Sequence, residues 1–360
     1  VRAQYEAVSQ WAERQAPLLD RVEALASAGH WGRPFGNRLD APLPRHAHLA
    51  RPYTRFALRF VQAQRKHDAA QAKADNPLDD LLAASEQADS EQFAAMQGLC
   101  RHTAAMQRLL TQPGQTLMAQ LLASAHVRQS TRLLADMLAE RAPEQPTPAA
   151  CAQAFAPQDG QPPALGVGTQ ASAAMCHSLR AEWQLLRSFE GLQPGWPWQY
   201  EGDVGEWLMV ALTQGNPRAT EALGAQARAA YCTPHYAQAY AQGDRAALQT
   251  PAPQFDTLSC VASPLACSQL GDMSFTTLAD SLHDREAMRR AMAGLLYTRA
   301  LLEGGPTDQD LAYAKRRARW EARPARLHMP GADAQWVEQP HRMLRVKLWA
   351  GEGAWFELPL

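Results

Sequence analysis

The stretch that decides the fold class is LMAQLLASAHVRQSTRLLADML, residues 117–138. A helix that packs on one neighbour has a single apolar stripe, whereas a helix with apolar residues on several faces is surrounded by neighbours. This stretch is of the second kind, and its large apolar residues are Leu117, Leu121, Leu122, Val127, Leu133, Leu134, Met137 and Leu138. The sequence therefore predicts a central helix here, within a mainly helical protein.

The residues before this central helix have the periodicity of further helices. In the first segment, apolar residues at spacings near three, four and seven form one stripe: Tyr5, Val8, Trp11, Leu18, Val22 and Leu25. Glycines and prolines within residues 29–44 end this helix. A second helix is expected from about Pro52 and a third from Pro77, since proline suits the first helical turn. We therefore predict an N-terminal helical lobe at residues 1–141.

A change of composition separates this lobe from the second half of the chain. Proline, glutamine and glycine are abundant in residues 142–169, and such a composition sustains neither a helix nor a strand. We therefore expect a linker at residues 142–172 and a C-terminal helical lobe at residues 173–360. Further helices are expected at about residues 171–190, 204–213, 217–242, 274–303 and 307–321.

Near the C-terminus the period of the apolar residues changes to two. Leu344, Val346 and Leu348 alternate with polar or aromatic residues, which is typical of a strand with one buried face. After two glycines, residues 355–358 are expected to return as the partner strand. An isolated hairpin is marginal in water, so its apolar face is expected to dock on the helices rather than to pair with another chain. The predicted fold is mainly α, with two helical lobes and a small C-terminal β-hairpin.

Charge and hydropathy exclude two classes of protein. The chain has 35 Lys and Arg residues against 36 Asp and Glu residues, so its net charge of −1 provides no overall attraction for nucleic acid. No run approaches the ~18 consecutive apolar residues that a membrane helix needs. We therefore expect no nucleic-acid partner and no membrane span within the residues given.

The cysteines indicate the compartment. The chain has six, Cys100, Cys151, Cys176, Cys232, Cys260 and Cys267. Cys260 and Cys267 flank a short loop with a proline, and closing that ring contributes about 2.5 kcal/mol wherever thiols can oxidise. Cys151 and Cys176 bracket the Pro/Gln/Gly-rich stretch and are expected to form a disulfide across it. Cys100 and Cys232 lie in segments with helical periodicity, and the favoured interpretation is that their thiols are free and buried. This pattern favours an exported protein.

The start of the chain fits the same compartment. Val1 is not a methionine, and an amphipathic helix begins at once, with no charged leader or apolar segment before it. A removed signal peptide or a removed membrane anchor fits this start, and so does a shortened cytosolic protein. Together with the cysteines, it leads us to expect a periplasmic location, with anchoring to the inner membrane through a segment upstream of Val1 as one option.

The sequence contains no complete catalytic or metal-binding motif. A structural zinc ion needs four ligands, and a pair such as Cys232 and His235 has no second pair at a suitable spacing. Ser281, His283 and Asp284 are neighbours in sequence, but residues two or three apart on a helix diverge around its axis. A helix surface or cap network is therefore favoured over a catalytic triad. We expect no metal and no cofactor, and the catalytic residues, if any, stay unknown.

The best candidate for a ligand site combines aromatic and acidic residues: Trp196, Trp198, Tyr200, Glu201, Asp203 and Glu206. Glycosidases use two carboxylates a fixed distance apart, and sugars stack on aromatic rings. The same aromatic density is more typical of a satellite core under a long loop. An open groove with two facing carboxylates would favour an enzyme, whereas buried tryptophans would favour a binding protein.

Three stretches carry a resemblance to known proteins. They are LLDRVEAL at residues 18–25, RPFGNRLDAPLPRHAHLARPY at residues 33–53, and SLHDREAMRRAMAGLL at residues 281–296 with a short β ending after it. Together they resemble an uncharacterised group of proteobacterial envelope proteins, which are largely helical and usually follow one N-terminal membrane anchor. This chain departs from the group in its cysteines and in lacking the anchor. The resemblance implies a location and a fold class, and it implies no activity.

These observations predict a non-enzymatic, exported binding or assembly protein of the bacterial envelope, whose partner is another envelope protein. The alternative, from a different functional class, is a periplasmic hydrolase or glycan-binding protein that uses the carboxylates beside the tryptophans of residues 196–207.

Overall fold

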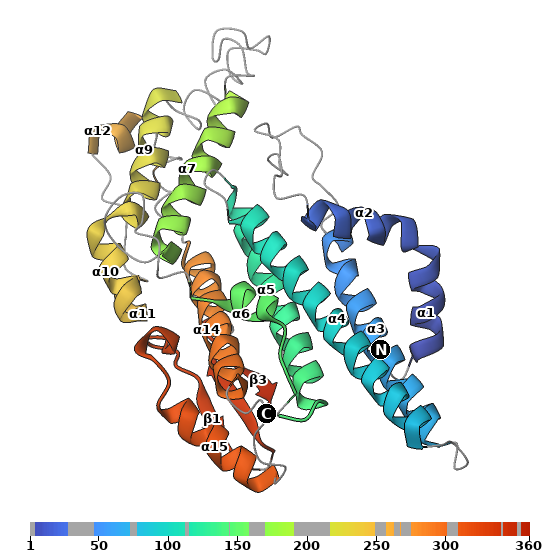
Figure 1. The fold of residues 1–360 in the computed structure, drawn as a ribbon. Coiled ribbons are helices and arrows are strands. Elements are labelled where there is room, and N and C mark those ends of the chain that lie inside the picture. The colour runs from blue at the N-terminus through green and yellow to red at the C-terminus, as the bar shows by residue number, and fades with distance from the viewer. Residues whose placement is uncertain are drawn as a thin grey trace.

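The computed structural model describes residues 4–27, 47–72, 78–111, 115–143, 145–157, 170–190, 217–248, 257–262, 267, 275–300, 309–339, 341–350 and 354–360. These residues form long helices and one small antiparallel sheet near the C-terminus (Figure 1). The predicted fold class, mainly helical with β-structure at the C-terminus, is therefore confirmed. Among the described residues, no helix has the length and apolar character needed to cross a membrane.

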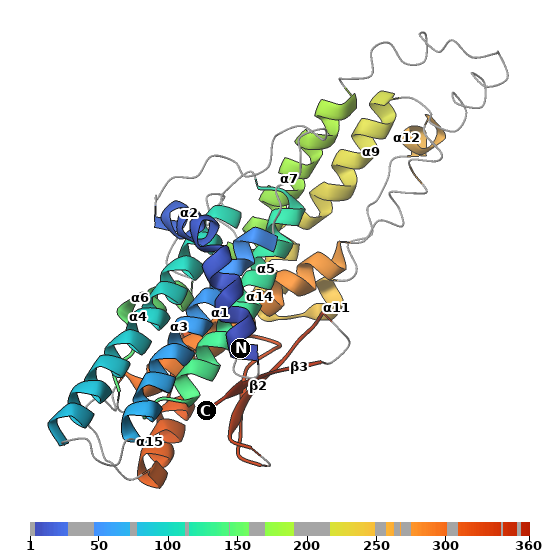
Figure 2. The same ribbon diagram turned by 90° about the vertical axis from the view of Figure 1, so that its right-hand side faces the viewer.

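The first four helices are α1 (Tyr5–Arg14), α2 (Ala16–Ser27), α3 (Ala47–Gln71) and α4 (Leu78–Leu110). The single helix expected at the start is divided at Gln15, two residues before Pro17, which has no N–H to donate to a continuous helix. α3 and α4 run side by side (Figures 1 and 2). They approach closely at Gly98, where an added Cβ would lie 2.6 Å from the ring of Phe56.

Two further helices lie at the centre of the molecule, α5 (Leu117–Ala139) and α14 (Thr276–Arg299). The Thr116 hydroxyl caps α5 by accepting a hydrogen bond from the Ala119 N–H at 3.4 Å. α5 packs on α4 and on α14, and it buries residues on more than one face. The prediction that this helix is central is therefore confirmed.

A short helix interrupts the stretch that was expected to be a linker without regular structure. α6 (Ala149–Phe155) begins after Pro148 and buries Cys151, Ala154 and Phe155. The expectation that residues 142–169 contain no helix was therefore wrong. Composition failed here because most helical stability comes from packing, and α6 packs against both α4 and α14.

The remaining helices of the described residues are α7 (Gln170–Glu190), α9 (Pro217–Ala229), α10 (Pro234–Gln242), α11 (Arg245–Leu248), α12 (Thr257–Ala262) and α15 (Gln309–Glu321), with 3₁₀ turns at Ala230–Cys232 and Ala325–Leu327. The single helix expected at residues 217–242 is divided at Pro234. There Thr233 is extended, and its hydroxyl accepts a hydrogen bond from the Tyr236 N–H at 3.2 Å. The helix expected at residues 204–213 lies outside the described residues.

The sheet has three strands in the order β1 (Gln335–Val337), β2 (Met343–Lys347) and β3 (Trp355–Pro359), all antiparallel. β2 and β3 are the predicted hairpin, and β1 adds a strand that the sequence pattern did not indicate. Leu344, Val346 and Leu348 are buried, as their alternation predicts. The hairpin face therefore docks on the body of the protein, beside α14 and α5.

One large apolar core includes residues from both halves of the chain. It runs from Phe56 of α3 and Leu134 of α5 to Met292 of α14 and Leu358 of β3, and a small second cluster surrounds Met106. Residues on both sides of the expected 142–172 linker thus share one core. The division into two lobes stays a prediction.

Candidate functional site

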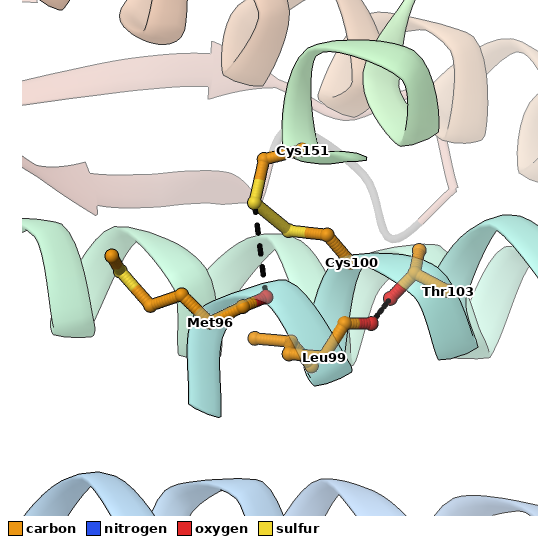
Figure 3. The surroundings of a disulfide bond; sticks show 5 residues. All are labelled: Met96, Leu99, Cys100, Thr103 and Cys151. Atoms are coloured by element: carbon orange, nitrogen blue, oxygen red, sulfur yellow. Dashed lines mark hydrogen bonds between the residues drawn. A yellow bond between two sulfur atoms is a disulfide. The ribbon is translucent and has the colours of Figure 1, made fainter. Parts of the chain in front are cut away.

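The first disulfide connects two of the packed helices. Cys100 of α4 is bonded to Cys151 of α6, with their Cα atoms 4.8 Å apart. Both cysteines are fully buried, and the Cys151 sulfur lies 3.8 Å from the carbonyl oxygen of Met96 (Figure 3). This bond holds α6 against α4.

Two further disulfides lie in the second half of the chain. Cys176 of α7 is bonded to Cys232, in the 3₁₀ turn after α9, with a Cα separation of 5.0 Å. Cys260 of α12 is bonded to Cys267, with a Cα separation of 5.1 Å. The second of these is the pair that the short spacing indicates. All six cysteines are therefore oxidised, which is typical of proteins from oxidising, exported compartments.

The other expected pairing was wrong. Cys151 and Cys176 are both in disulfides, but not with each other, and Cys100 and Cys232 are bonded rather than free. The reason is that α6 packs on α4, whereas α7 packs on α9 and the turn after it. The true partners are 51 and 56 residues apart in sequence, so local spacing does not reveal them.

The aromatic and acidic residues singled out from the sequence lie outside the described residues: Trp196, Trp198, Tyr200, Glu201, Asp203 and Glu206. Their role as a ligand site stays a prediction. In the described part of the chain, no group of three or more His, Cys, Asp or Glu side chains is arranged to hold a metal ion.

The densest group of buried ionisable side chains lies on α14. A surface helix exposes its charged residues, but α14 is surrounded by α5, α6, α7, α15 and β2. The charged or titratable residues it buries are Asp280, His283, Asp284, Arg285, Arg289 and Arg299. Because burying an unpaired charge is costly, the partners of these groups decide what they can do.

His283 is fully buried and stacks on Trp349, with ring centroids 3.3 Å apart and an interplanar angle of 6°. Its Nε2 lies 3.0 Å from the carbonyl oxygen of Pro330, which can only accept, so Nε2 carries the proton. Burial, together with the nearby Arg290 and Arg245, lowers the pKa of His283 to about 4, although the hydrogen bond to the Pro330 carbonyl acts in the opposite direction. His283 is therefore a neutral donor at neutral pH.

Asp284 holds the end of β2. Its two carboxylate oxygens accept hydrogen bonds from the backbone N–H groups of Trp349 at 2.7 Å and Ala350 at 2.9 Å. Burial raises the pKa of Asp284 to about 6, although these two hydrogen bonds act in the opposite direction. Asp280 adds to the same junction through Arg245, which donates at 2.7 Å both to Asp280 and to the Trp349 carbonyl.

The buried arginines of α14 bind oxygen atoms of other segments. Arg299 donates to three carbonyls at and beyond the C-terminal end of α5, those of Leu138 at 3.1 Å, Arg141 at 3.3 Å and Ala142 at 2.7 Å. The carbonyls of Leu138 and Ala142 also accept backbone hydrogen bonds, from the Arg141 and Gln145 N–H groups, and the cation matches the negative end of the helix dipole. Arg285 donates to the side-chain oxygen of Gln120 on α5 at 2.9 Å. The arginines therefore join α14 to α5.

The side chains of Ser281, His283 and Asp284 bind backbone groups of this chain rather than one another. The Ser281 hydroxyl donates to the Thr277 carbonyl at 2.8 Å, and His283 and Asp284 bind backbone groups of residues 330 to 350. The three neighbours in sequence thus form no triad, as their helical spacing predicts. Sequence reasoning missed Arg245 and Trp349 because neither lies in a recognisable motif.

Comparison with protein-family models, with curated proteins and with solved structures finds no match to this chain. The resemblance to envelope proteins therefore stays a prediction.

Proposed function

We propose that this chain is a non-enzymatic, exported binding or assembly protein of the bacterial envelope. The observation that carries the proposal is the set of three disulfides that includes every cysteine. Disulfides persist in the periplasm and are rare in the cytosol. Two of them join cysteines 51 and 56 residues apart, so they restrict the unfolded chain strongly. They stabilise the fold only where thiols stay oxidised.

The surroundings of α14 favour binding over bond chemistry. A general base or a nucleophile must present a polar atom to its substrate. Asp280, His283 and Asp284 are each at most 8% exposed, and each is hydrogen-bonded to an arginine or to the backbone of this chain. In the described residues, the best constellation of ionisable groups is therefore used to hold the fold.

The proposed partner is another envelope protein, and anchoring through a segment upstream of Val1 belongs to the same proposal. The support is the resemblance of three stretches to anchored envelope proteins. Exposed apolar side chains also occur on two elements, with Leu258 and Val261 on α12 and Trp355 on β3. Protein partners commonly cover such side chains.

Export is tested by alkylating the protein in cells of its native host before lysis, followed by mass spectrometry without reduction. We expect disulfide-linked peptides for Cys100–Cys151 and Cys176–Cys232 in the periplasmic fraction. The matched control is the same chain expressed in a reducing cytosol, where the thiols should alkylate. Alkylation of all six thiols in the native host would overturn the proposal.

The glycan-related alternative has its own test, because its residues are separate from α14. If the tryptophans of residues 196–207 form a sugar site, Trp198→Ala should abolish binding of soluble glycan fragments and leave the melting temperature unchanged. If they form a small core, the same variant should lower the melting temperature by several degrees, and the intact protein should bind no fragment.

A further inference from the structure

The two edge strands of the sheet differ in length. β1 has three residues, and its Trp336 side chain donates to the Tyr313 hydroxyl of α15 at 2.6 Å. β3 has five residues and forms the opposite edge. An edge strand presents unpaired N–H and C=O groups, which makes it a template for another strand. The β3 edge is thus the longer template of the two.

The hydrogen bonds at the ends of β3 show which residues face outward. The Leu348 N–H donates to the Ala354 carbonyl, and the Leu360 N–H donates to the Arg342 carbonyl. Because facing directions alternate along an antiparallel strand, Phe356 and Leu358 also bond to β2. The backbone groups of Trp355, Glu357 and Pro359 therefore point away from the sheet. Among the described residues, the N–H groups of Trp355 and Glu357 have no acceptor.

We propose that the β3 edge pairs with the β3 edge of a second copy of this chain, in an antiparallel arrangement with the two-fold axis at Phe356. In this register Trp355 of each copy lies opposite Glu357 of the other copy. The two pairs exchange four backbone hydrogen bonds, which use every outward N–H group of both strands. The two three-stranded sheets become one six-stranded sheet. The inference goes beyond the proposed function and holds whether or not the protein is exported.

The neighbouring registers are less favourable. Moving the axis to Glu357 places the two Glu357 carboxylates opposite each other, and like charges in that position are destabilising. It also places Trp355 opposite Pro359, which has no N–H to donate. Moving the axis to Trp355 places Glu357 beyond the first residue of the partner strand. Of these registers, only the one with its axis at Phe356 lets the N–H groups of both Trp355 and Glu357 donate to residues of the partner strand.

The side chains fit the same register. On the exposed face of the sheet, Glu357 already pairs with Arg345 at 2.9 Å, and Lys347 lies opposite Trp355. Across the proposed junction the order becomes Arg345, Glu357, then Trp355 and Lys347 of the second copy. No like charges are adjacent in this row. Trp355, which is 43% exposed in one chain, would be covered by the opposite Glu357 stem.

The first test is the mass of the full chain by light scattering coupled to size exclusion, over a series of concentrations. We expect a concentration-dependent shift from 39.6 kDa toward twice that mass. Glu357→Pro removes an outward N–H that β2 does not use, so it should abolish the dimer, while at concentrations where the chain is monomeric its melting temperature should match that of Glu357→Thr. Glu357→Thr is the matched control, because it also removes the carboxylate but keeps the N–H, and it should still dimerise.

The second test reads the register and does not depend on the proline variant. In a hydrogen-bonded antiparallel pair the Cα atoms are about 5.5 Å apart, which a disulfide can bridge. A mixture of Trp355→Cys and Glu357→Cys proteins should therefore form a cross-linked dimer on mild oxidation, whereas neither variant alone should. Cross-linking of Glu357→Cys alone would contradict the register. A chain that stays monomeric at every soluble concentration would overturn the proposal and leave the edge to a different partner.

Discussion

Two neighbouring residues of α14 should give the protein opposite responses to acid. His283 and Asp284 are both buried, at 0% and 5% exposure, so burial disfavours the charged form of each. For the histidine that form is protonated, and for the aspartate it is deprotonated. We expect His283→Gln and Asp284→Asn to change the pH dependence of unfolding in opposite directions.

The magnitude follows from the difference in pKa between the folded and unfolded chain. The pKa of His283 is lowered from 6.5 to about 4, so the unfolded chain takes up its proton first and stability is lost as the pH falls through this window. The pKa of Asp284 is raised from 3.8 to about 6, so the folded chain takes up its proton first and stability is gained. At about pH 5, relative to about pH 8, the loss is ~2 kcal/mol and the gain ~1.4 kcal/mol.

The assay is urea unfolding of the two variants and the parent chain at both pH values. Relative to the parent, His283→Gln should gain ~2 kcal/mol between about pH 8 and about pH 5, and Asp284→Asn should lose ~1.4 kcal/mol. Ser281→Ala, which removes no ionisable group from the same helix, is the control and should keep the pH dependence of the parent. Shifts of the same sign in the two variants, or no shift in either, would refute the reasoning.

Three further substitutions test the packing. Gly294→Ala places a Cβ 2.5 Å from the Trp320 ring, so overpacking of about 1–3 kcal/mol should outweigh the better helix propensity of alanine, and an unchanged melting temperature would contradict this contact. Arg299→Met removes the three hydrogen bonds that join α14 to the end of α5 and should lower the urea midpoint by the equivalent of about 1–3 kcal/mol. Leu344→Ala should cost about 2–5 kcal/mol, because that side chain is fully buried, and a loss below this range would place the hairpin outside the core.

Local pattern was sufficient for most of the helices and for the hairpin. The helix expected at residues 171–190 begins at Gln170 and ends at Glu190, and the one expected at residues 307–321 is α15. The stripe of α15 is only partly apolar, since Arg316 is buried on it between Ala312 and Trp320. The alternation at Leu344, Val346 and Leu348 identified β2 and its buried face, because a period of two is specific to strands. The third strand, β1, has three residues and is too short for a pattern.

Long-range contacts were outside the reach of the sequence. α6 lies in a Pro- and Gln-rich stretch, and it forms because its Cys151 and Phe155 side chains are buried and the first is bonded to α4. The same contact decides the disulfide pairing. Spacing identified only the Cys260–Cys267 pair, whose closure involves no other element. A pairing between distant helices follows from the packing of those helices, which residue order alone does not contain.

The buried charges of α14 illustrate why a charge-rich helix was interpreted as a surface. Charged residues are rarely buried without partners, so SLHDREAMRR indicates a solvated face when it is considered alone. The partners that allow burial come from distant positions: Gln120 for Arg285, Pro330 for His283, and the Trp349 backbone for Asp284. Each of these hydrogen bonds also brings another element to α14. Removing either partner of one of these hydrogen bonds would leave a buried polar group unpaired. The charged residues that make α14 resemble a surface helix in sequence therefore also specify which segments it contacts.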